Sequence, residues 1–176
     1  EDIKKINQSK ALKQYKNVDV VMGGPPCQGF SMAGRRIRNN GAFLNDSRNH
    51  LFKEFYETVN QIRPKVFIIE NVPGIISFNH GSVKNSIFSL FEDIGYETDV
   101  KVLKASEYGI PQYRKRAFFI GNNLELNTED FFPKKTHGLG TNKKEVTIQD
   151  AIFDLPFIEN GQGSFESEYD KAPTTL

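Results

Sequence analysis

The chain has 176 residues, of which 38% are hydrophobic and 26% are charged, and it contains a single Cys. This length suits one domain, and 15 Phe with 6 Tyr provide enough apolar surface for a packed core. Disordered, collagen-like and coiled-coil chains are therefore excluded. One Cys excludes a disulfide scaffold, and with three scattered His it makes no closed zinc site, so we expect no metal. The single Cys favours the reducing cytoplasm. No stretch approaches the roughly 20 apolar residues of a membrane span, so we expect no membrane contact.

The net charge of +1 conceals an uneven distribution. Residues 1–122 contain 18 Lys and Arg against 12 Asp and Glu, a net charge of +6. Residues 123–176 contain 5 against 10, a net charge of −5. The first part could bind a polyanion such as a nucleic acid, although a basic excess of this size is also typical of an ordinary solvated surface.

Strands and helices are predicted to alternate along the first part of the chain. Val18–Met22 is a short β-branched strand that runs into the turn 23–26. A helix is expected from a cap at Asp46 or Ser47 to the residues before Pro64. Its apolar face would consist of Leu51, Phe55, Val59 and Ile62. The apolar run 66–69 then predicts a strand that is buried on both faces of a parallel sheet.

The second half continues this alternation and then becomes irregular. Ser82 is predicted to cap a helix that ends at Gly95, with Val83, Ile87, Leu90 or Phe91, and Ile94 facing inward. Strands at 97–103 and 117–120 could pair in antiparallel fashion. A short capped helix is expected within 147–155, followed by irregular chain. This order predicts an α/β fold, in which ligands bind beyond the carboxyl ends of the strands.

Cys27 follows the first predicted strand. A lone Cys is most often an inert buried residue. Here two prolines stiffen the approach, and the glycines on both sides allow another molecule to come close. A thiol at the end of a sheet strand is placed as a nucleophile.

Polar side chains also lie beside the later strands. Glu70 follows four apolar residues, which indicates a helix cap, an ion-pair partner, or a carboxylate that can donate a proton. In extended chain Gln112, Arg114 and Arg116 would share one face, where the guanidinium groups suit an anion or a carbonyl oxygen. A solvated basic edge is the alternative. The Gly- and Asn-rich segment 34–45 is either a surface loop or a lid that closes on phosphates.

Taken together, these motifs follow a characteristic order. Gly23-Gly24-Pro25-Pro26-Cys27-Gln28-Gly29-Phe30-Ser31 comes first, then Asp46-Ser47-Arg48, then Glu70-Asn71-Val72, then Tyr108-Gly109-Ile110-Pro111-Gln112 with Arg114 and Arg116. This series resembles the cytosine-5 DNA methyltransferase family over about residues 18–122. Residues 147–156 are similar to the segment that leads into the family's target-recognition region.

The resemblance implies a methyltransferase fold that uses S-adenosylmethionine, with a Rossmann-like doubly wound sheet that is incomplete at both ends. Residues 1–122 would form a partial catalytic core without the N-terminal cofactor loop, and 123–176 would lead toward target recognition. The family transfers a methyl group to cytosine C5 in double-stranded DNA after flipping the base out of the duplex. A bacterial restriction-modification enzyme is expected.

Roles follow from the same resemblance. The Cys27 thiolate would add to cytosine C6, protonated Glu70 would bind N3, and Arg116 aided by Arg114 would hold O2. Predicted cofactor contacts are Asp2, Ile3, Pro26, Leu51, Asn71 and Val72. Predicted DNA contacts are Gln28, Ser31, Arg35, Arg36, Arg38 and Gln112.

Three alternatives stay open. A tRNA cytosine-5 methyltransferase would share the Cys, Glu and Arg motifs. A truncated or split half would self-associate or need a partner, and would bind S-adenosylmethionine poorly by itself. A thiol hydrolase is disfavoured, because His50, His80 and His137 lie in no context that marks a partner for Cys27.

Overall fold

The computed structural model describes residues 2–8, 12, 15, 17–26 and 50–166. The chain forms two compact units. The first unit comprises Glu1–Leu103 with Lys115–Pro133, and the second comprises Lys104–Arg114 with Lys134–Leu176. The predicted helix cap at Asp46 or Ser47 lies outside the described residues.

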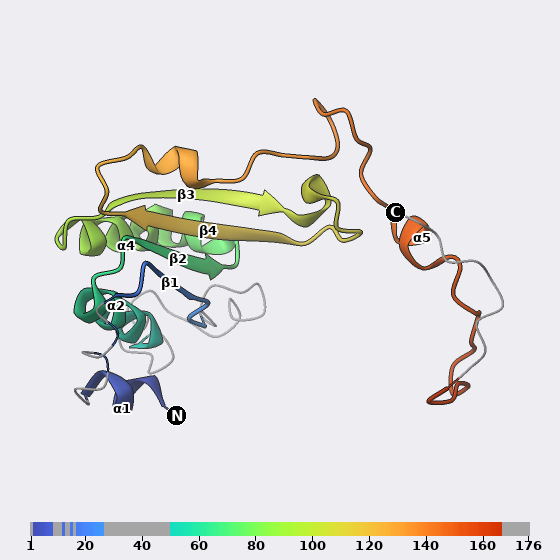
Figure 1. The fold of residues 1–176 in the computed structure, drawn as a ribbon, viewed down its shortest axis with the longest axis horizontal. Helices are drawn as coiled ribbons and strands as arrows, with labels where there is room; N and C mark the ends of the chain where they lie inside the picture. Colours follow the sequence, from blue (N-terminus) through green and yellow to red (C-terminus); the bar gives the residue numbers. More distant parts are fainter. Residues whose placement is uncertain (1, 9–11, 13–14, 16, 27–49, 167–176) are drawn as a thin grey trace. The chain divides into compact units, whose positions relative to one another are not determined.

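A four-stranded sheet forms the centre of the first unit (Figure 1). Its strands are β1 (Val20–Gly23), β2 (Val66–Asn71), β3 (Glu97–Lys104) and β4 (Lys115–Asn122), in the order β1-β2-β4-β3. β1 and β2 are parallel, whereas β2 and β4 are antiparallel, with Ile68 opposite Ile120. The arrows of β3 and β4 point in opposite directions in Figure 1, which confirms the predicted antiparallel pairing. Local sequence did not predict that β4 would lie between β2 and β3.

Two helices pack against one face of this sheet. Helix α2 (His50–Ile62) contributes Phe55 and Val59, and α4 (Ser82–Glu92) contributes Val83, Ile87 and Phe91. They meet Phe67, Ile69, Ala117 and Phe119 of β2 and β4 in one buried cluster. The rings of Phe67 and Phe91 stack with centroids 3.9 Å apart. The predicted inward residues Phe55, Val59 and Ile62 of α2 and Val83, Ile87 and Phe91 of α4 are thus buried, whereas Leu51 is half-buried and Ile94 lies beyond the end of α4.

The prediction that Ser82 caps α4 is wrong. The cap is Gly81, with φ of +82°, and Ser82 is the first helical residue. A left-handed conformation of this kind favours glycine, which explains why the helix begins after Gly81. The helix ends at Glu92, three residues before the predicted end, and Gly95, with φ of +79°, closes the turn that follows.

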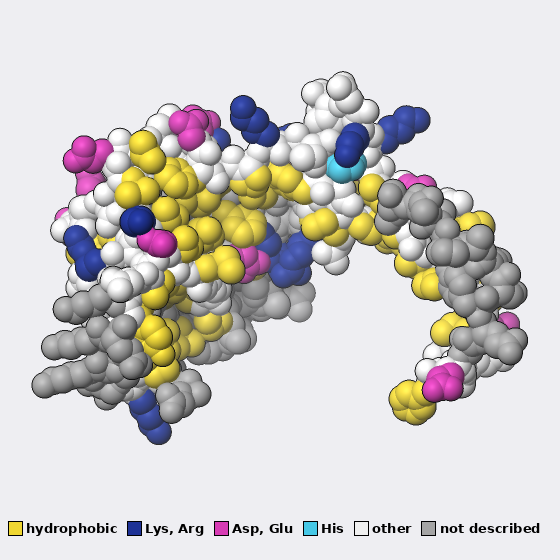
Figure 2. Space-filling view, in the orientation of Figure 1, with side chains coloured by type: hydrophobic (Ala, Val, Ile, Leu, Met, Phe, Trp, Pro, Cys, Tyr) yellow, Lys and Arg dark blue, Asp and Glu magenta, His cyan; other side chains and the backbone are white. Residues whose placement is uncertain are grey.

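The prediction that β2 is buried on both faces is also wrong for the described residues. Phe67, Ile69 and Asn71 are buried, whereas Val66, Ile68 and Glu70 on the other face are half-buried. On the neighbouring β1, Val20 is 50% exposed and Met22 is 73% exposed. The reason is that α2 and α4 both pack on the face that carries Phe67. Apolar side chains are also visible around β3 and β4 in Figure 2.

Short helices complete the described structure. They are α1 (Ile3–Gln8), α3 (Gly74–Ser77), η4 (Phe78–Gly81), η5 (Ala105–Tyr108), η6 (Thr128–Phe131) and α5 (Ile148–Ile152). Helix α5 has the predicted cap, because the Thr147 side chain and Asp150 form a reciprocal capping box. Among the described residues, no helix has the length and apolar character needed to cross a membrane.

Candidate active site

Glu70 and Arg116 meet on the half-buried face of the sheet. Glu70 lies near the end of β2 and Arg116 near the start of the antiparallel β4. Arg116 Nε lies 2.7 Å from Glu70 Oε1, and Arg116 Nη1 donates a 2.9 Å hydrogen bond to the Lys115 carbonyl. The side chain of Glu70 is 36% exposed and that of Arg116 is 25% exposed, so solvent can reach the pair. A carboxylate and a guanidinium in this arrangement can hold a flat polar molecule by complementary hydrogen bonds.

The turn after β1 runs beside this carboxylate. A Cβ atom on Gly24 would lie 3.3 Å from Glu70 Oε2, which is a tight contact. A Cβ atom on Gly23 would lie 2.8 Å from the ring of Phe55 in α2. The two glycines therefore let the chain pass closely between α2 and Glu70 on its way to Cys27. Cys27 itself lies outside the described residues.

Asn71 anchors the same turn to the sheet. Its Nδ2 donates a 3.1 Å hydrogen bond to the Pro25 carbonyl, and its Oδ1 accepts one of 2.9 Å from the Val72 amide. Asn71 is only 5% exposed, so this bond forms away from water. It fixes the backbone two residues before Cys27.

The predicted cofactor residues that the structure describes all belong to the first unit. Pro26 is exposed, Leu51 and Val72 are half-buried, and Asn71 is buried. Asp2 lies just before α1, where its Oδ1 accepts a 3.0 Å hydrogen bond from the Lys4 amide, and Ile3 begins the helix. Pro26 and Val72 follow the carboxyl ends of β1 and β2, where ligands bind in sheets of this kind.

The remaining predicted residues separate into two groups. Gln112 and Arg114 lie in the second unit and precede β4, so Arg116 alone of the three belongs to that strand. The backbone N–H of Gln112 donates a 2.7 Å hydrogen bond to the Ile110 carbonyl in a tight turn. Gln28, Ser31, Arg35, Arg36 and Arg38 lie outside the described residues.

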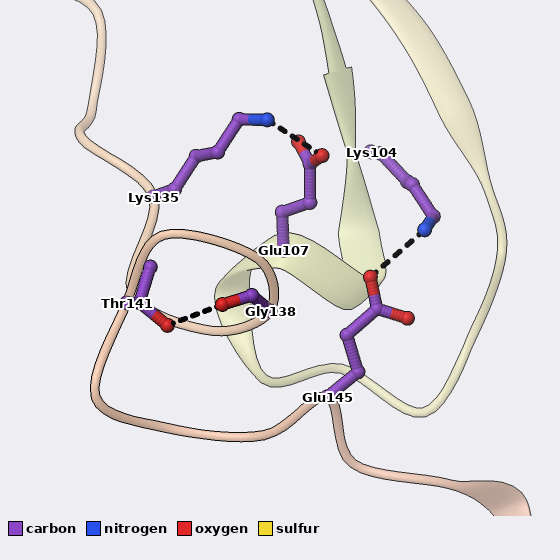
Figure 3. A network of polar contacts seen from close by, with 6 residues as sticks. All are labelled: Lys104, Glu107, Lys135, Gly138, Thr141 and Glu145. Carbon is purple, nitrogen blue, oxygen red and sulfur yellow. Dashed lines mark hydrogen bonds and ion pairs between the residues drawn. The ribbon is translucent and has the colours of Figure 1, made fainter.

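Sequence reasoning missed a polar network around the loop that carries Gln112 and Arg114. Lys104 and Glu107 of the loop pair with Glu145 and Lys135 of a later segment (Figure 3). The signal is weak in the sequence because Lys and Glu are common surface residues, and the partners lie 41 and 28 positions apart.

A family model for the C-5 cytosine-specific DNA methylases matches residues 1–171. The chain belongs to this family. The methylase motifs around Cys27 and Glu70 that suggested the resemblance therefore lie within the matched range.

Curated relatives of this methylase chain are Type II methyltransferases. M1.HphI of Haemophilus parahaemolyticus is 40% identical over 166 residues, which is 93% of this chain and 42% of that protein. M.DdeI of Desulfomicrobium norvegicum is 38% identical, over 98% of this chain and 41% of that protein. The chain thus spans about two fifths of the length of these relatives. M.AquIA of a Picosynechococcus is 33% identical and is covered to 69% of its length.

A solved structure supports the methylase fold. A prophage-encoded DNA modification methyltransferase of E. coli is 36% identical and superposes with a TM-score of 0.64. The match covers 90% of this chain and 42% of that one. The mixed sheet described above is therefore the methyltransferase fold predicted from the sequence.

Proposed function

We propose that the whole protein transfers a methyl group to C5 of cytosine in double-stranded DNA. One observation of the structure carries this proposal. The Glu70–Arg116 pair lies beside Gly24, in the turn that leads to Cys27. A proton donor, a cation and a nucleophile at the ends of neighbouring strands are what activation of a cytosine ring requires.

The residues would act in sequence on a flipped base. The Cys27 thiolate adds to C6, which makes C5 nucleophilic, while Glu70 donates a hydrogen bond to the N3 edge. Arg116, aided by Arg114, stabilises the charge that develops at O2. After methyl transfer, loss of the C5 proton restores the double bond and expels the Cys27 thiolate. In this complex, the contact between Glu70 and Arg116 would be exchanged for contacts to the ring.

The turn 23–26 would set the position of the nucleophile. Asn71 holds the Pro25 carbonyl, and two prolines restrict the backbone between that bond and Cys27. A thiol that is held in place loses less entropy when it reaches C6. In well-oriented reactions such positioning lowers the activation barrier by roughly 7–11 kcal/mol at most. We assign Asn71 a positioning role in addition to its predicted place near the cofactor.

S-adenosylmethionine, when bound, would supply the methyl group. Asp2, Ile3, Pro26, Leu51, Asn71 and Val72 would form one side of its site. Because the chain spans about two fifths of the length of M1.HphI and M.DdeI, we expect the 176-residue chain by itself to bind the cofactor weakly. Isothermal titration of the chain with millimolar cofactor tests this point, and micromolar affinity would contradict it.

The basic segment 34–45 would contribute contacts to DNA. Arg35, Arg36 and Arg38 would bind phosphates, and Gln28, Ser31 and Gln112 would lie near the displaced base. Because M1.HphI and M.DdeI are Type II methyltransferases, we place the protein in a bacterial restriction-modification system in the cytoplasm.

The test is to identify the product. The protein is incubated with S-adenosylmethionine and either duplex DNA or tRNA, and the digested nucleosides are separated by mass spectrometry. We expect 5-methyldeoxycytidine from DNA and none from tRNA. Methylation of tRNA alone would favour the tRNA enzyme, and N4-methylcytosine or N6-methyladenine would contradict the proposed chemistry.

A further inference from the structure

The loop Lys104–Arg114 connects β3 to β4 and carries Gln112 and Arg114, yet it has little regular structure of its own. Its helical part is the short η5. The loop closes on itself through a 2.8 Å hydrogen bond from the Ala105 amide to the Arg114 carbonyl. Three further backbone bonds join Gly109 to Ser106, Ile110 to Ala105 and Gln112 to Ile110. All of them lie within the loop, so its attachment to the rest of the chain depends on other contacts.

A later segment, Lys134–Glu145, packs against this loop within the same unit. The amides of Thr136 and His137 both donate hydrogen bonds of 3.0 Å to the Glu107 carbonyl. The ring of His137 lies over Gly109, where an added Cβ atom would approach within 2.6 Å of His137 Cε1. The backbone of the loop is therefore held at its middle.

Lys104 and Glu145 connect the same two segments at the start of the loop (Figure 3). Lys104 Nζ lies 2.8 Å from Glu145 Oε1, and the two side chains are only 20% and 27% exposed. The ammonium group also lies 4.3 Å from the centroid of the Tyr113 ring. By comparison, the side chains of the ion pair Lys101–Glu129 are 35% and 65% exposed. We call Lys104, Glu145 and Tyr113 the latch.

The latch spans the whole loop. Lys104 begins it, Tyr113 directly precedes Arg114 at its end, and Glu145 comes from the other segment. A half-enclosed cation between a carboxylate and an aromatic face interacts more strongly than an exposed pair does. Loss of Glu145 would therefore remove a contact that both ends of the loop share.

We propose that Glu145 is a positioning residue, which acts through Lys104 and Tyr113 to hold the loop that presents Gln112 and Arg114. The role rests on the proposed cytosine methylation, since it is the contacts of Gln112 with DNA and of Arg114 with the base that need a fixed loop. A misplacement of about 1 Å in such groups costs as much as 10²-fold in rate.

The experiment compares Glu145→Gln with Glu129→Gln in the whole protein, because both changes neutralise one carboxylate of a lysine pair. Hydrogen exchange measures the loop directly, and methylation measures its consequence. In Glu145→Gln we expect faster exchange of the amides in 105–114 and a rate of DNA methylation that is lower by roughly tenfold. The affinity for S-adenosylmethionine should not change. Glu129→Gln should match the wild type in both measurements.

A charge exchange provides the second arm. Lys104→Glu alone places two carboxylates together and should open the loop further. The double variant Lys104→Glu with Glu145→Lys should show stronger protection and faster DNA methylation than either Lys104→Glu or Glu145→Lys alone. Unchanged exchange in Glu145→Gln, or faster exchange with an unchanged methylation rate, would overturn the proposal. A wild-type protein that methylates no cytosine would contradict the proposed function instead, and the exchange rates would still decide whether the latch holds the loop.

Discussion

The side chain of Asn71 holds the carbonyl of Pro25 at 3.1 Å, across 46 positions of sequence. The bond is buried and connects the end of β2 to the turn that approaches Cys27. It makes the position of the predicted nucleophile depend on a residue of the neighbouring strand.

Asn71→Asp should therefore impair Cys27 more than it impairs the fold. The substitution replaces the donor of a buried hydrogen bond by an acceptor, which costs about 1–3 kcal/mol of stability or more. Asn122→Asp is the matched control, because Asn122 is also buried and donates to a carbonyl, that of Leu126 at 3.0 Å. We expect similar losses of thermal stability, whereas methylation per folded molecule should fall in Asn71→Asp only. Equal activities per folded molecule would contradict the positioning role.

Glu70→Gln should reduce methylation by about 10²-fold or more, which is the usual range for loss of a general acid. Its folding should change little, because the Glu70 side chain is 36% exposed and its partner Arg116 keeps a bond to the Lys115 carbonyl. The comparison is Asp19→Asn, which removes a carboxylate from the exposed pair with Lys65 and should retain full activity. If Glu70→Gln loses its melting transition instead, the carboxylate serves the fold.

The latch predicts a characteristic pH dependence of loop protection. The hydrogen bond from Lys104 lowers the pKa of Glu145 below its ordinary 4.5, and the bond to Glu145 raises the pKa of Lys104 above its ordinary 10.5. The stabilisation of the loop by the Glu145 carboxylate is thus complete above its ordinary pKa and is lost as the pH falls through the lowered pKa. The Lys104 contribution is complete below its ordinary pKa and is lost as pH rises through the raised one.

Protection of 105–114, corrected for intrinsic exchange, should accordingly stay constant around neutral pH and fall once the pH drops below 4.5, the ordinary pKa of Glu145. In Glu145→Gln this acid-dependent step should be smaller, because among the described residues only the ion pair Glu107–Lys135 still joins the two segments through a carboxylate. A step near neutral pH in the wild type would show that another group controls the loop.

Arg35, Arg36 and Arg38 should bind DNA phosphates. Replacing all three by Gln should weaken binding to every DNA sequence and should reduce the slope of log K against log salt by about 0.9 for each lost contact. Replacing Lys134, Lys143 and Lys144, three exposed cations of the second unit, is the comparison that removes equal charge elsewhere. An unchanged slope in the Arg variant would assign the segment 34–45 to an ordinary surface loop.

Sequence patterns predicted those features that depend on near neighbours in the chain. The apolar spacing of Phe55 and Val59 predicted the inner face of α2, and Thr147 correctly marked a helix start. Each of these depends on the conformation of a few adjacent residues. The sequence predicted Ser82 as the cap because Ser and Gly are both common at that position. Only the left-handed φ of Gly81, which the sequence does not reveal, identifies Gly81 as the cap.

Features that depend on distant pairing could not be predicted in this way. The insertion of β4 between β2 and β3 brings Arg116 to Glu70, although each residue alone is equally compatible with a surface ion pair. The bond from Asn71 to Pro25 and the pair Lys104–Glu145 join residues 46 and 41 positions apart. Burial of one face of β2 depends on where α2 and α4 pack, and alternation within the strand sequence does not reveal it.

Covalent trapping on DNA tests the central claim most directly. The protein is incubated with S-adenosylmethionine and duplex DNA that carries 5-fluorocytosine at the target base, and adducts are separated by denaturing electrophoresis. Because fluorine cannot leave C5 as the proton does, the thiolate cannot be expelled, and we predict a stable adduct through Cys27 that requires the cofactor and is lost in Cys27→Ser. An adduct of equal yield in Cys27→Ser, or methyl transfer by that variant, would contradict the account.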